Sequence, residues 1–225
     1  MIIVTGGNSG IGAEITKSLR LKGEKVITIS RSEIKNDKNH FSCDLSDYYS
    51  LKNIYKFISK KKFNITALIN CAGIASMNLA ITTPPGVTEK LVKTNLIGTI
   101  FSNQIFAPSI IKSGGGSIIN FSTIAVSIGL KGESVYVASK AGIEAFSRTF
   151  ANELSDFKIT VNCIAPGPIK TNLLKGISDK QIKSIIKRQI IKKEMKAYDV
   201  VKVVKMLLSK DAYGITGQVL HVGGV

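Results

Sequence analysis

The amino-acid sequence predicts an α/β protein in which helices cover both faces of a doubly wound parallel sheet. Short runs rich in valine and isoleucine alternate with amphipathic segments of helical length along the whole chain. Strands that alternate with helices in this way form parallel sheets. The 225 residues are 44% hydrophobic and 20% charged. That size and balance suit one soluble domain over residues 1–225, built around one large core.

The predicted strands are apolar runs that are rich in β-branched residues and too short for buried helices. They lie at residues 2–4, 25–29, 67–69, 117–121, 160–164 and 219–222. The predicted helices are the amphipathic segments at residues 11–22, 47–60, 86–112, 134–156 and 197–209. Neither an internal repeat nor a linker-like change of composition interrupts the alternation.

Two stretches depart from this simple pattern. About a dozen residues separate Arg31 from Asp44, and a full crossover helix barely fits into that length. A loop or a single turn is therefore expected there. The segment 172–196 is polar and lysine-rich, and it follows a Pro-Gly-Pro turn. We interpret it as a helical substrate lid of modest stability.

Composition excludes several classes of function. No stretch approaches 18 uninterrupted apolar residues, so no membrane-spanning segment is expected. The three cysteines, Cys43, Cys71 and Cys163, are isolated and lack the spacing of metal ligands. They predict no metal site and suit a reducing cytoplasm. The two histidines, His40 and His221, belong to no catalytic cluster and are expected in solvated or strand-end positions.

The net charge of +16 comes mostly from lysine. Residues 158–210 alone carry 13 lysines and arginines against three acidic residues. The chain lacks a basic stripe interleaved with aromatic residues, so a solvated lysine surface is favoured over a nucleic-acid site. A basic face over 158–210 could instead steer an acidic partner toward an active site.

A glycine-rich loop, Thr-Gly-Gly-Asn-Ser-Gly-Ile-Gly at residues 5–12, links the first strand to the first helix. Glycines at this junction permit a tight turn, close approach of a pyrophosphate and close packing of helix on sheet. The helix N-terminus then offers free N–H groups to the anion. The alternative is a purely structural turn. The residues expected to bind a dinucleotide here are Gly6, Asn8, Ser9, Gly10, Ile11 and Gly12.

The end of the second strand bears on the choice of cofactor. An acidic residue there binds the ribose 2′-hydroxyl in proteins that use NAD. This chain has Ser30, Arg31 and Ser32 instead. The guanidinium group suits a 2′-phosphate, so the sequence predicts NADP(H) in preference to NAD(H). The alternative is that Arg31 is an ordinary solvated loop residue.

Tyr136 and Lys140 are four residues apart on a predicted helix, so they share one face. A lysine cation beside a phenol is expected to lower the pKa of the tyrosine. Such a phenol can exchange a proton with a carbonyl or an alcohol. A tyrosine and a lysine at this spacing often occur by chance. The pair becomes evidence for an active site because the chain also contains the glycine-rich loop.

Further motifs follow in a fixed order. Asn-Cys-Ala-Gly lies at residues 70–73, Asn95 lies in the next helix, and Tyr136 and Lys140 follow. Pro-Gly-Pro-Ile-Lys-Thr occupies residues 166–171, and Ile-Thr-Gly-Gln occupies 215–218. With the Thr-Gly-x-x-x-Gly-x-Gly loop, these motifs resemble the short-chain dehydrogenase/reductase family over residues 5–224. The resemblance implies a Rossmann fold.

The resemblance also implies a catalytic group. Tyr136 would transfer the proton, while Lys140 would lower its pKa and hold the nicotinamide ribose. Asn95 would anchor a water molecule in a proton relay, although a helix-interior asparagine bonded to the backbone is the alternative. The family places a hydroxyl 13 residues before the tyrosine, which is Thr123 here. Ser122 is kept as the fallback, and strand alternation points the two to opposite faces.

The cofactor contacts are implied in the same way. Asp44 and Leu45 would lie at the adenine, although Asp44 could also serve the start of the next helix. The residues that would line the ribose and nicotinamide side are Asn70, Ala72, Gly73, Tyr136 and Lys140. The carboxamide and diphosphate would be wrapped by Pro166, Gly167, Ile169 and Thr171.

Within the family, the segments 161–169 and 217–222 are most similar to 3-oxoacyl-[acyl-carrier-protein] reductases. They imply an NADP(H)-dependent interconversion of a ketone and a secondary alcohol in the cytoplasm. The substrate would be a small-molecule or acyl-thioester carbonyl compound, the latter on an acidic carrier protein. A reductase or dehydrogenase of a sugar, polyol or other small carbonyl compound is one alternative. A non-catalytic NADP(H)-binding sensor or subunit is another. The resemblance further implies a homodimer or homotetramer built on the helices that carry Asn95 and Tyr136.

Overall fold

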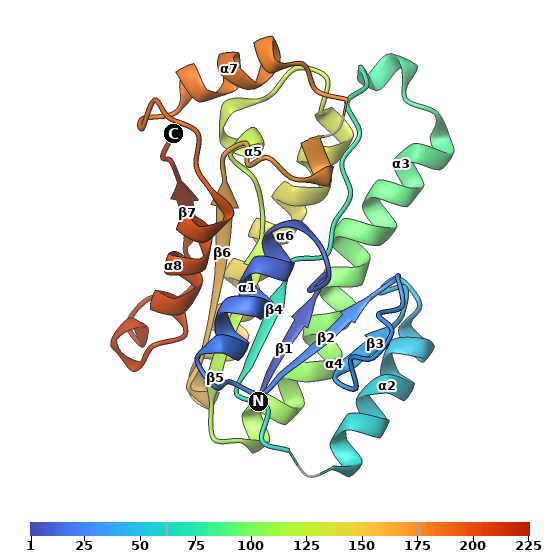
Figure 1. Cartoon of the computed structure of the whole chain (residues 1–225), viewed down its shortest axis with the longest axis vertical. Helices are drawn as coiled ribbons and strands as arrows, with labels where there is room; N and C mark the ends of the chain where they lie inside the picture. The colour runs from blue at the N-terminus through green and yellow to red at the C-terminus, as the bar shows by residue number, and fades with distance from the viewer. Residues whose placement is uncertain (62, 175) are drawn as a thin grey trace.

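Seven parallel strands form one sheet in the order β3-β2-β1-β4-β5-β6-β7 (Figure 1). The computed structural model describes residues 1–61, 63–174 and 176–225. The strands are β1 (Ile2–Thr5), β2 (Val26–Ser30), β3 (His40–Ser42), β4 (Ala67–Asn70), β5 (Gly116–Phe121), β6 (Ile159–Pro166) and β7 (Val219–Val222). The predicted α/β class and the doubly wound parallel sheet are confirmed.

Helices cover both faces of this sheet. They are α1 (Gly10–Leu21), α2 (Tyr48–Lys60), α3 (Pro85–Leu91), α4 (Gly98–Lys112), α5 (Ile124–Ile128), α6 (Ser134–Glu153), α7 (Asp179–Arg188) and α8 (Ala197–Leu207). In the described part of the chain, none of them is long and apolar enough to cross a membrane.

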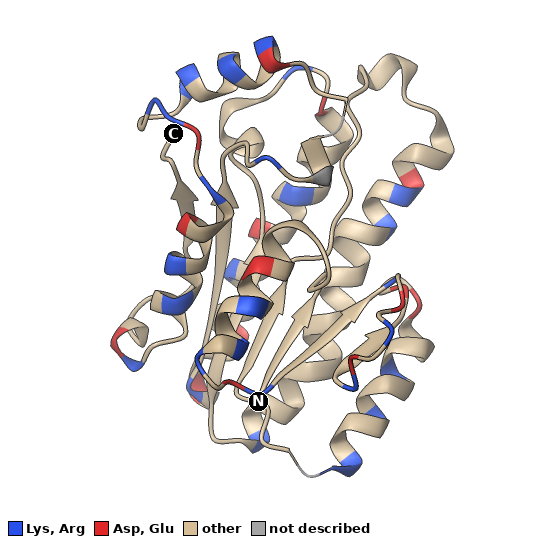
Figure 2. Ribbon diagram, in the orientation of Figure 1, with Lys and Arg blue, Asp and Glu red and all other residues tan. Residues whose placement is uncertain are grey.

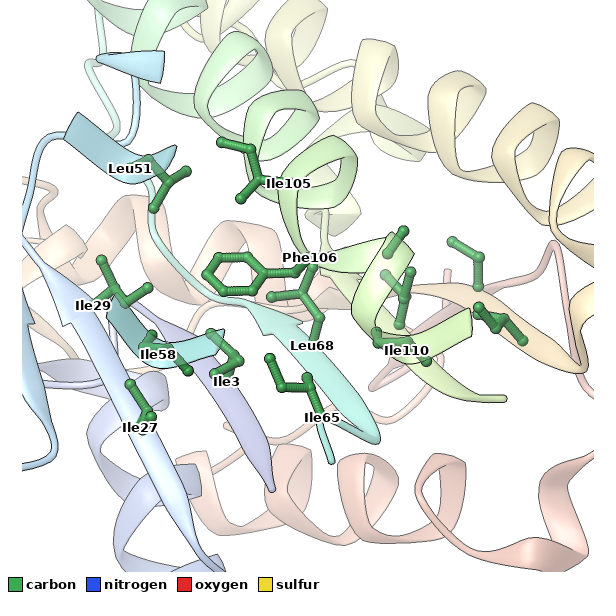
Figure 3. Close-up of a cluster of buried hydrophobic side chains, with 14 of the residues drawn as sticks. Ile3, Ile27, Ile29, Leu51, Ile58, Ile65, Leu68, Ile105, Phe106 and Ile110 are labelled. Carbon is green, nitrogen blue, oxygen red and sulfur yellow. The ribbon is translucent and has the colours of Figure 1, made fainter. Parts of the chain in front are cut away.

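The core consists of two apolar layers, one on each face of the sheet. Ile3 of β1 joins side chains of α2, α4 and α6 in one layer (Figure 3). Its neighbours Ile2 and Val4 join side chains of α1 and α8 in the other. This alternation follows from the two-residue period of a strand. Every central strand is therefore apolar on both sides, as parallel sheets require.

The strand order reverses between β1 and β4, which both lie in the middle of the sheet. The first connection after β1 leads outward to β2 and β3, whereas the chain after β4 continues toward β5, β6 and β7. Loops on either side of such a switch point diverge at the carboxyl ends of the strands and leave a crevice. The glycine-rich loop after β1 and residues 71–73 after β4 border this crevice.

The segment between Arg31 and Asp44 differs from the expected loop or single turn. It contains no helix, but His40–Ser42 forms the short strand β3, which pairs with β2. Its three residues are only partly buried. A three-residue edge strand of this kind has no apolar run from which it could be predicted. The five-residue helix α5 was missed for a similar reason, because it is shorter than two helical turns.

The predicted helix 86–112 is a continuous helical run with an irregular middle. Between α3 and α4 the residues Val92–Ile97 form a π-helical segment. Such wide turns often mark functional sites. The segment places the side chain of Asn95 in the interior, where it is fully buried.

The segment 172–196, predicted as a helical lid, contains the short 3-10 turn Asn172–Leu174 and the helix α7. Residue 175 lies outside the described residues. A capping box between Ser178 and Gln181 begins α7. In Figure 1 this helix crosses above the carboxyl ends of the strands.

The residues that follow α7 in the sequence are hydrogen-bonded to the C-terminal residues. The backbone N–H groups of Ile190 and Ile191 donate to the carbonyls of Gly224 and Gly223. The side chain of Gln189 is fully buried next to Gly167 and Gly223. Neither polar atom of the Gln189 amide has a hydrogen-bond partner within the described residues.

Candidate active site

A cavity of about 500 Å³ opens at the carboxyl ends of the central strands. The glycine-rich loop, Tyr136 and Lys140 all line it. Eighteen of the twenty residues expected to bind or react line this single cavity, and only Asn70 and Asn95 do not. Its lining includes Gly6, Asn8, Ser9, Gly10, Ile11, Gly12, Arg31, Asp44, Leu45, Ala72, Gly73, Thr123, Tyr136, Lys140, Pro166, Gly167, Ile169 and Thr171.

The glycine-rich loop has the shape of a cradle. Gly6 has a positive φ of 66°, and a Cβ atom there would lie 2.7 Å from the backbone nitrogen of Ala72. At Gly12 a Cβ atom would lie 2.3 Å from the carbonyl oxygen of Gly6. Helix α1 can therefore approach the loop only without a side chain at residue 12. Ser9, the N-cap residue, makes no side-chain hydrogen bond to the helix.

These observations fit a bound dinucleotide. A Cβ atom at residue 6 or 12 would collide with the backbone of Ala72 or Gly6, so the loop can take this shape only with glycine at both positions. The N-terminus of α1 carries a partial positive charge and uncapped N–H groups, which favour a pyrophosphate. The same cavity continues from there to Tyr136, so the nicotinamide end of the molecule would reach the reacting group.

The Ser30-Arg31-Ser32 turn lines the same cavity. Strand β3 holds its backbone: the Ser42 hydroxyl donates to the Arg31 carbonyl at 2.9 Å, and His40 Nε2 lies 2.8 Å from the Ser32 carbonyl oxygen. A carbonyl only accepts, so His40 Nε2 carries a proton. We expected His40 in a solvated or strand-end position, and its supporting role was not predicted.

Asp44 lines the cavity and also makes a local turn. Its Oδ1 accepts from the backbone N–H of Ser46 at 2.9 Å and from the Ser46 hydroxyl at 2.8 Å. The N-cap of α2 is Asp47, whose carboxylate accepts from the backbone N–H of Ser50. The alternative that Asp44 serves the start of the next helix is therefore wrong in detail, since Asp47 has that role.

Asn70 points into the interior, away from the expected ribose-binding surface. Its amide nitrogen donates to Asn120 Oδ1 at 2.8 Å, and its oxygen accepts from the Thr5 hydroxyl at 3.2 Å. Asn120 in turn contacts Asn103 and Ser147. This buried chain of polar groups connects β1, β4 and β5 to α4 and α6. It fixes the strand ends that form the cavity floor.

Tyr136 and Lys140 lie on consecutive turns of α6 and are both buried, with exposed fractions of 6% and 5%. The Lys140 ammonium group donates to the carbonyl of Phe121 at 2.8 Å. Burial lowers the pKa of Lys140 to about 8. Burying a charged lysine costs free energy because the ammonium group loses its hydration. The hydrogen bond to the Phe121 carbonyl offsets part of that cost.

The expected lowering of the Tyr136 pKa does not occur. Burial raises the pKa of Tyr136, and the neighbouring Glu133 carboxyl raises it further. A hydrogen bond with Thr123 acts in the opposite direction but is weaker. Desolvation dominates because the phenol is shut away from water. Tyr136 is therefore a neutral phenol, which suits it to donate a proton.

The hydroxyls of Thr123 and Ser122 have different partners. Thr123 caps α5: its Oγ1 accepts from the backbone N–H of Ala125 at 3.2 Å, and the same side chain hydrogen-bonds Tyr136. Ser122 turns away and donates to the Glu144 carboxylate at 2.5 Å. The structure thus brings Thr123, and not Ser122, to the Tyr136 phenol.

All of the polar atoms of the Asn95 amide are bonded to the protein. Its oxygen accepts from the Ile74 N–H at 2.8 Å, and its nitrogen donates to the Ile74 carbonyl at 2.9 Å and the Ser139 hydroxyl at 3.0 Å. This arrangement matches the alternative of an asparagine bonded largely to backbone. Asn95 positions the loop after β4 against α6 through Ile74, the residue that follows Gly73.

Two residues of the site escaped sequence reasoning. Ser139, which lies between Tyr136 and Lys140 in the sequence, receives the Asn95 bond and is fully surrounded by protein. Glu133 lies one turn before Tyr136, is 6% exposed and lines the cavity. A carboxyl three residues before Tyr136 was the available signal for Glu133, which is the N-cap residue of α6.

Comparison with known proteins identifies the family. A family of short-chain dehydrogenases/reductases, described as Enoyl-(Acyl carrier protein) reductase, matches residues 6–224. The chain is a short-chain dehydrogenase/reductase. It is 35% identical to the 3-oxoacyl-[acyl-carrier-protein] reductase of Buchnera aphidicola from Schizaphis graminum, over 99% of this chain and 95% of that protein. The Haemophilus influenzae protein of the same name is 32% identical over 99% and 96% of the two chains.

Solved structures agree with this family. The aldohexose dehydrogenase of Thermoplasma acidophilum superposes with a TM-score of 0.89 at 29% identity, over 99% of this chain and 92% of that one. ElxO with NADP bound gives 0.88 at 27% identity over 98% and 96%. A 4-hydroxyisoleucine dehydrogenase complexed with NADH gives 0.90 at 26% identity over 99% and 97%.

This short-chain dehydrogenase/reductase is therefore an oxidoreductase that interconverts CH–OH and C=O groups, and its family binds NAD(P). This chain aligns with nearly the whole length of these relatives. The family resemblance and the function class predicted from the motifs are therefore confirmed. Within the described residues no group of three histidine, cysteine or acidic side chains is placed to hold a metal ion.

Proposed function

We propose that the protein reduces a 3-oxoacyl thioester carried by acyl carrier protein, with NADPH as the cofactor. The observation that carries this proposal is one cavity that is lined both by Arg31 and by the group of Thr123, Tyr136 and Lys140. Relatives named 3-oxoacyl-[acyl-carrier-protein] reductase, which match along the whole chain, support the choice of substrate.

When bound, NADPH supplies the hydride that adds to the carbonyl carbon. The neutral Tyr136 phenol donates its proton to the carbonyl oxygen as negative charge develops there. Thr123 donates a second hydrogen bond to the same oxygen, in the manner of an oxyanion hole. Lys140 keeps a positive charge near the phenol after the proton has left, and Phe121 holds the Lys140 ammonium group in place.

The preference for NADPH rests on the turn after β2. The Arg31 side chain is exposed and lines the cavity, next to two serine hydroxyls. The turn has no carboxylate to bind a 2′-hydroxyl or to repel a 2′-phosphate. A guanidinium group can form two parallel hydrogen bonds to a phosphate. Structures of similar proteins contain either NADP or NADH, so measured affinities for both cofactors decide the choice.

The lid region supports a carrier-bound substrate. Lys180, Lys183 and Lys187 are exposed and follow one another along α7, and Figure 2 shows the basic residues of this helix in blue. Ile185 of the same helix lines the cavity. A basic surface at the entrance would steer an acidic carrier protein toward the site. The attraction is between exposed charges, so salt screens it.

The test compares acetoacetyl-[acyl-carrier-protein] with ethyl acetoacetate, which contains the same 3-oxoacyl group without the carrier. We expect kcat/KM for the carrier-bound substrate to be higher and to fall as salt rises, while that for the ester stays nearly constant. Replacing the three α7 lysines with alanine should have the same selective effect. Equal rates at every salt concentration would argue against carrier recognition.

A reductase or dehydrogenase of sugars or polyols is the second candidate, because the chain is similar to an aldohexose dehydrogenase over nearly its full length. Turnover of aldohexoses that exceeds turnover of acetoacetyl thioesters would favour it. Tight NADPH binding without turnover of any carbonyl compound would favour a cofactor sensor. A homodimer or homotetramer, assembled through α4 and α6, is part of the proposal, and light scattering that shows a monomer would remove it.

A further inference from the structure

The imidazole ring of His40, at the start of β3, holds the turn that follows β2. Its Nε2 atom lies 2.8 Å from the carbonyl oxygen of Ser32 in the turn, and its Nδ1 atom lies 2.8 Å from the hydroxyl oxygen of Thr28 in β2. A carbonyl oxygen only accepts, so Nε2 donates, and in the neutral ring Nδ1 accepts from the Thr28 hydroxyl. Both ring nitrogens are therefore bonded within the protein, and His40 is not one of the residues that line the cavity.

Thr28 gives the His40 ring a rigid support. It is 1% exposed, and it pairs directly with His40 in the ladder between β2 and β3. Its hydroxyl faces His40, while its methyl group packs against Gly7 of the glycine-rich loop, 2.6 Å from the position that a Cβ atom at Gly7 would take. A β-branched side chain has few rotamers. Because Thr28 is held from two sides, the ring that bonds to it is fixed relative to the turn.

Two carbonyl groups of the turn point toward β3 as a result. The Ser32 carbonyl accepts from His40 Nε2, and the Ser30 hydroxyl also donates to it at 3.3 Å. The Arg31 carbonyl accepts from the Ser42 hydroxyl at 2.9 Å. All three residues of the turn line the cavity. A carbonyl group released from β3 would therefore be free to turn into the cavity.

The direction of these carbonyl groups bears on which ribose the turn can accept. NADPH has a phosphate at the 2′ position, where NADH has a hydroxyl. A carbonyl oxygen carries partial negative charge, so it repels a phosphate, but it accepts a hydrogen bond from a hydroxyl. The exposed guanidinium group of Arg31 attracts the phosphate. A turn whose carbonyl groups face β3 therefore favours NADPH, and a turn whose carbonyl groups face the cavity favours NADH.

We propose that His40 is a positioning residue that sets the choice of cofactor. By holding the Ser32 carbonyl against β3, it keeps partial negative charge away from the 2′-phosphate. It also presents Arg31 on a backbone that is already ordered, which lowers the entropic cost of binding. This inference rests on the proposed preference for NADPH and deepens it, because it names the residue through which the fold makes Arg31 effective.

Two substitutions separate the roles of the two ring nitrogens. In His40→Gln the amide nitrogen is as many bonds from Cβ as Nε2 is, so a donor to Ser32 is kept. In His40→Asn the amide reaches only as far as Nδ1, so the contact with Thr28 is kept and the donor to Ser32 is lost. His221→Asn is the matched control, because His221 bonds to Ser127 and lies outside the residues that line the cavity.

Binding is measured without any carbonyl substrate. Fluorescence titration gives the dissociation constants of NADPH and NADH, and competition with 2′,5′-ADP and 5′-AMP repeats the comparison on ligands that differ only in the 2′-phosphate. We expect the wild type to bind NADPH more tightly than NADH. His40→Asn should weaken binding of NADPH and 2′,5′-ADP by roughly fivefold to tenfold, as is typical of one lost hydrogen bond. Binding of NADH and 5′-AMP should stay unchanged or become slightly tighter.

His40→Gln should recover most of that loss, and His221→Asn should match the wild type. Retained binding of NADH reports that each variant is folded. The inference would be overturned by a His40→Asn protein that keeps the wild-type preference, or by a Gln variant as poor as the Asn variant. Equal weakening of NADPH and NADH would make His40 merely structural, and the same selective loss in His221→Asn would remove the specific role of the turn.

The proposed function can fail separately from this inference. If the wild type bound NADPH and NADH equally, the proposed cofactor preference would be wrong, and the role of His40 would be lost with it. If the wild type preferred NADPH and His40→Asn did so to the same extent, only the role of His40 would be wrong. None of these binding results bears on the carrier-bound substrate, which is tested by turnover.

Discussion

The Lys140 ammonium group donates a 2.8 Å hydrogen bond to the carbonyl of Phe121, the last residue of β5. This bond anchors α6 to the end of a central strand at the point where the cavity begins. Lys140 is thus oriented by the sheet before any cofactor binds. Its position near Tyr136 is a consequence of the fold as well as of their spacing on one helix.

Stability should depend on pH through Lys140. Burial lowers its pKa to about 8 from an ordinary 10.5. Between these values the unfolded chain holds more protons than the folded one, so folding becomes more favourable as pH rises. Below pH 8 both states hold the proton, and the full cost of the buried charge applies. The change across this window is on the order of 3 kcal/mol for this one group.

Urea denaturation of the wild type and Lys140→Met at several pH values between 7.5 and 10.5 measures this effect. The wild type should become more stable relative to Lys140→Met as pH rises, as judged by their free energies of unfolding. Comparing them at each pH cancels the contribution of the other groups. Lys93→Met, at an exposed lysine of the π-helical segment, is the control. A difference that stays constant over the range would contradict the buried, charged lysine.

Thr123→Val should lower kcat at least tenfold with little change in NADPH affinity, because it removes the hydroxyl beside Tyr136 and keeps the shape of the side chain. Ser122→Ala should remain active and lose roughly 1–2 kcal/mol of stability, because Glu144 loses its buried donor. Steady-state kinetics and urea titrations of both variants distinguish these effects. A large kinetic loss in Ser122→Ala together with an active Thr123→Val would reverse the two roles.

Arg31→Ala should weaken NADPH binding by roughly tenfold or more and leave NADH binding nearly unchanged, because only NADPH carries the 2′-phosphate. Fluorescence titration with each cofactor gives the two affinities. Arg148→Ala, on α6 and outside the residues that line the cavity, serves as the matched loss of an arginine. If both cofactors weakened equally in Arg31→Ala, the guanidinium group would have no part in choosing between them.

Gly12→Ala should abolish cofactor binding or folding, because the new Cβ would lie 2.3 Å from the Gly6 carbonyl oxygen. Backbone must move to relieve that contact, and the affected backbone is the phosphate-binding loop itself. Gly86→Ala, where the added atom meets nothing within 4 Å, should be neutral or slightly stabilising in its helix. Thermal unfolding with and without NADPH compares the variants. A Gly12→Ala protein that is stabilised by NADPH as strongly as the wild type would disprove the steric argument.

The central sheet was predictable because each inner strand is apolar on both faces. A parallel sheet with the first strand at its centre is the arrangement that accommodates the Ile-rich runs of β1, β4 and β5 together with the Gly6–Gly12 loop. The edge strand β3 was not predictable. It has two half-buried residues and one exposed residue, and pairing with β2 stabilises it in place of an apolar run. Helix α5 depends on the Thr123 cap and on burial in the folded protein.

The site was predictable to the extent that sequence spacing fixes geometry. Tyr136, Lys140 and Thr123 came together because a helix and a strand end place them there. The acidity of Tyr136 was predicted wrongly, because sequence shows the nearby lysine but not the loss of water around the phenol. Asn70 and Asn95 were expected to have roles at the cofactor and the water relay. Their side-chain bonds to other parts of the interior depend on tertiary contacts that no spacing reveals.

The packing of Gln189 has a consequence for the variation of related sequences. Its side chain occupies the space that a Cβ atom at Gly167 or Gly223 would need, at 2.9 and 2.0 Å from the Gln189 amide. A larger residue at either glycine position would require a smaller one at 189. Positions 167, 189 and 223 should therefore covary among homologues, although they are far apart in the chain. Such a signal would mark where the lid, the turn after β6 and the C-terminal residues evolve as one unit.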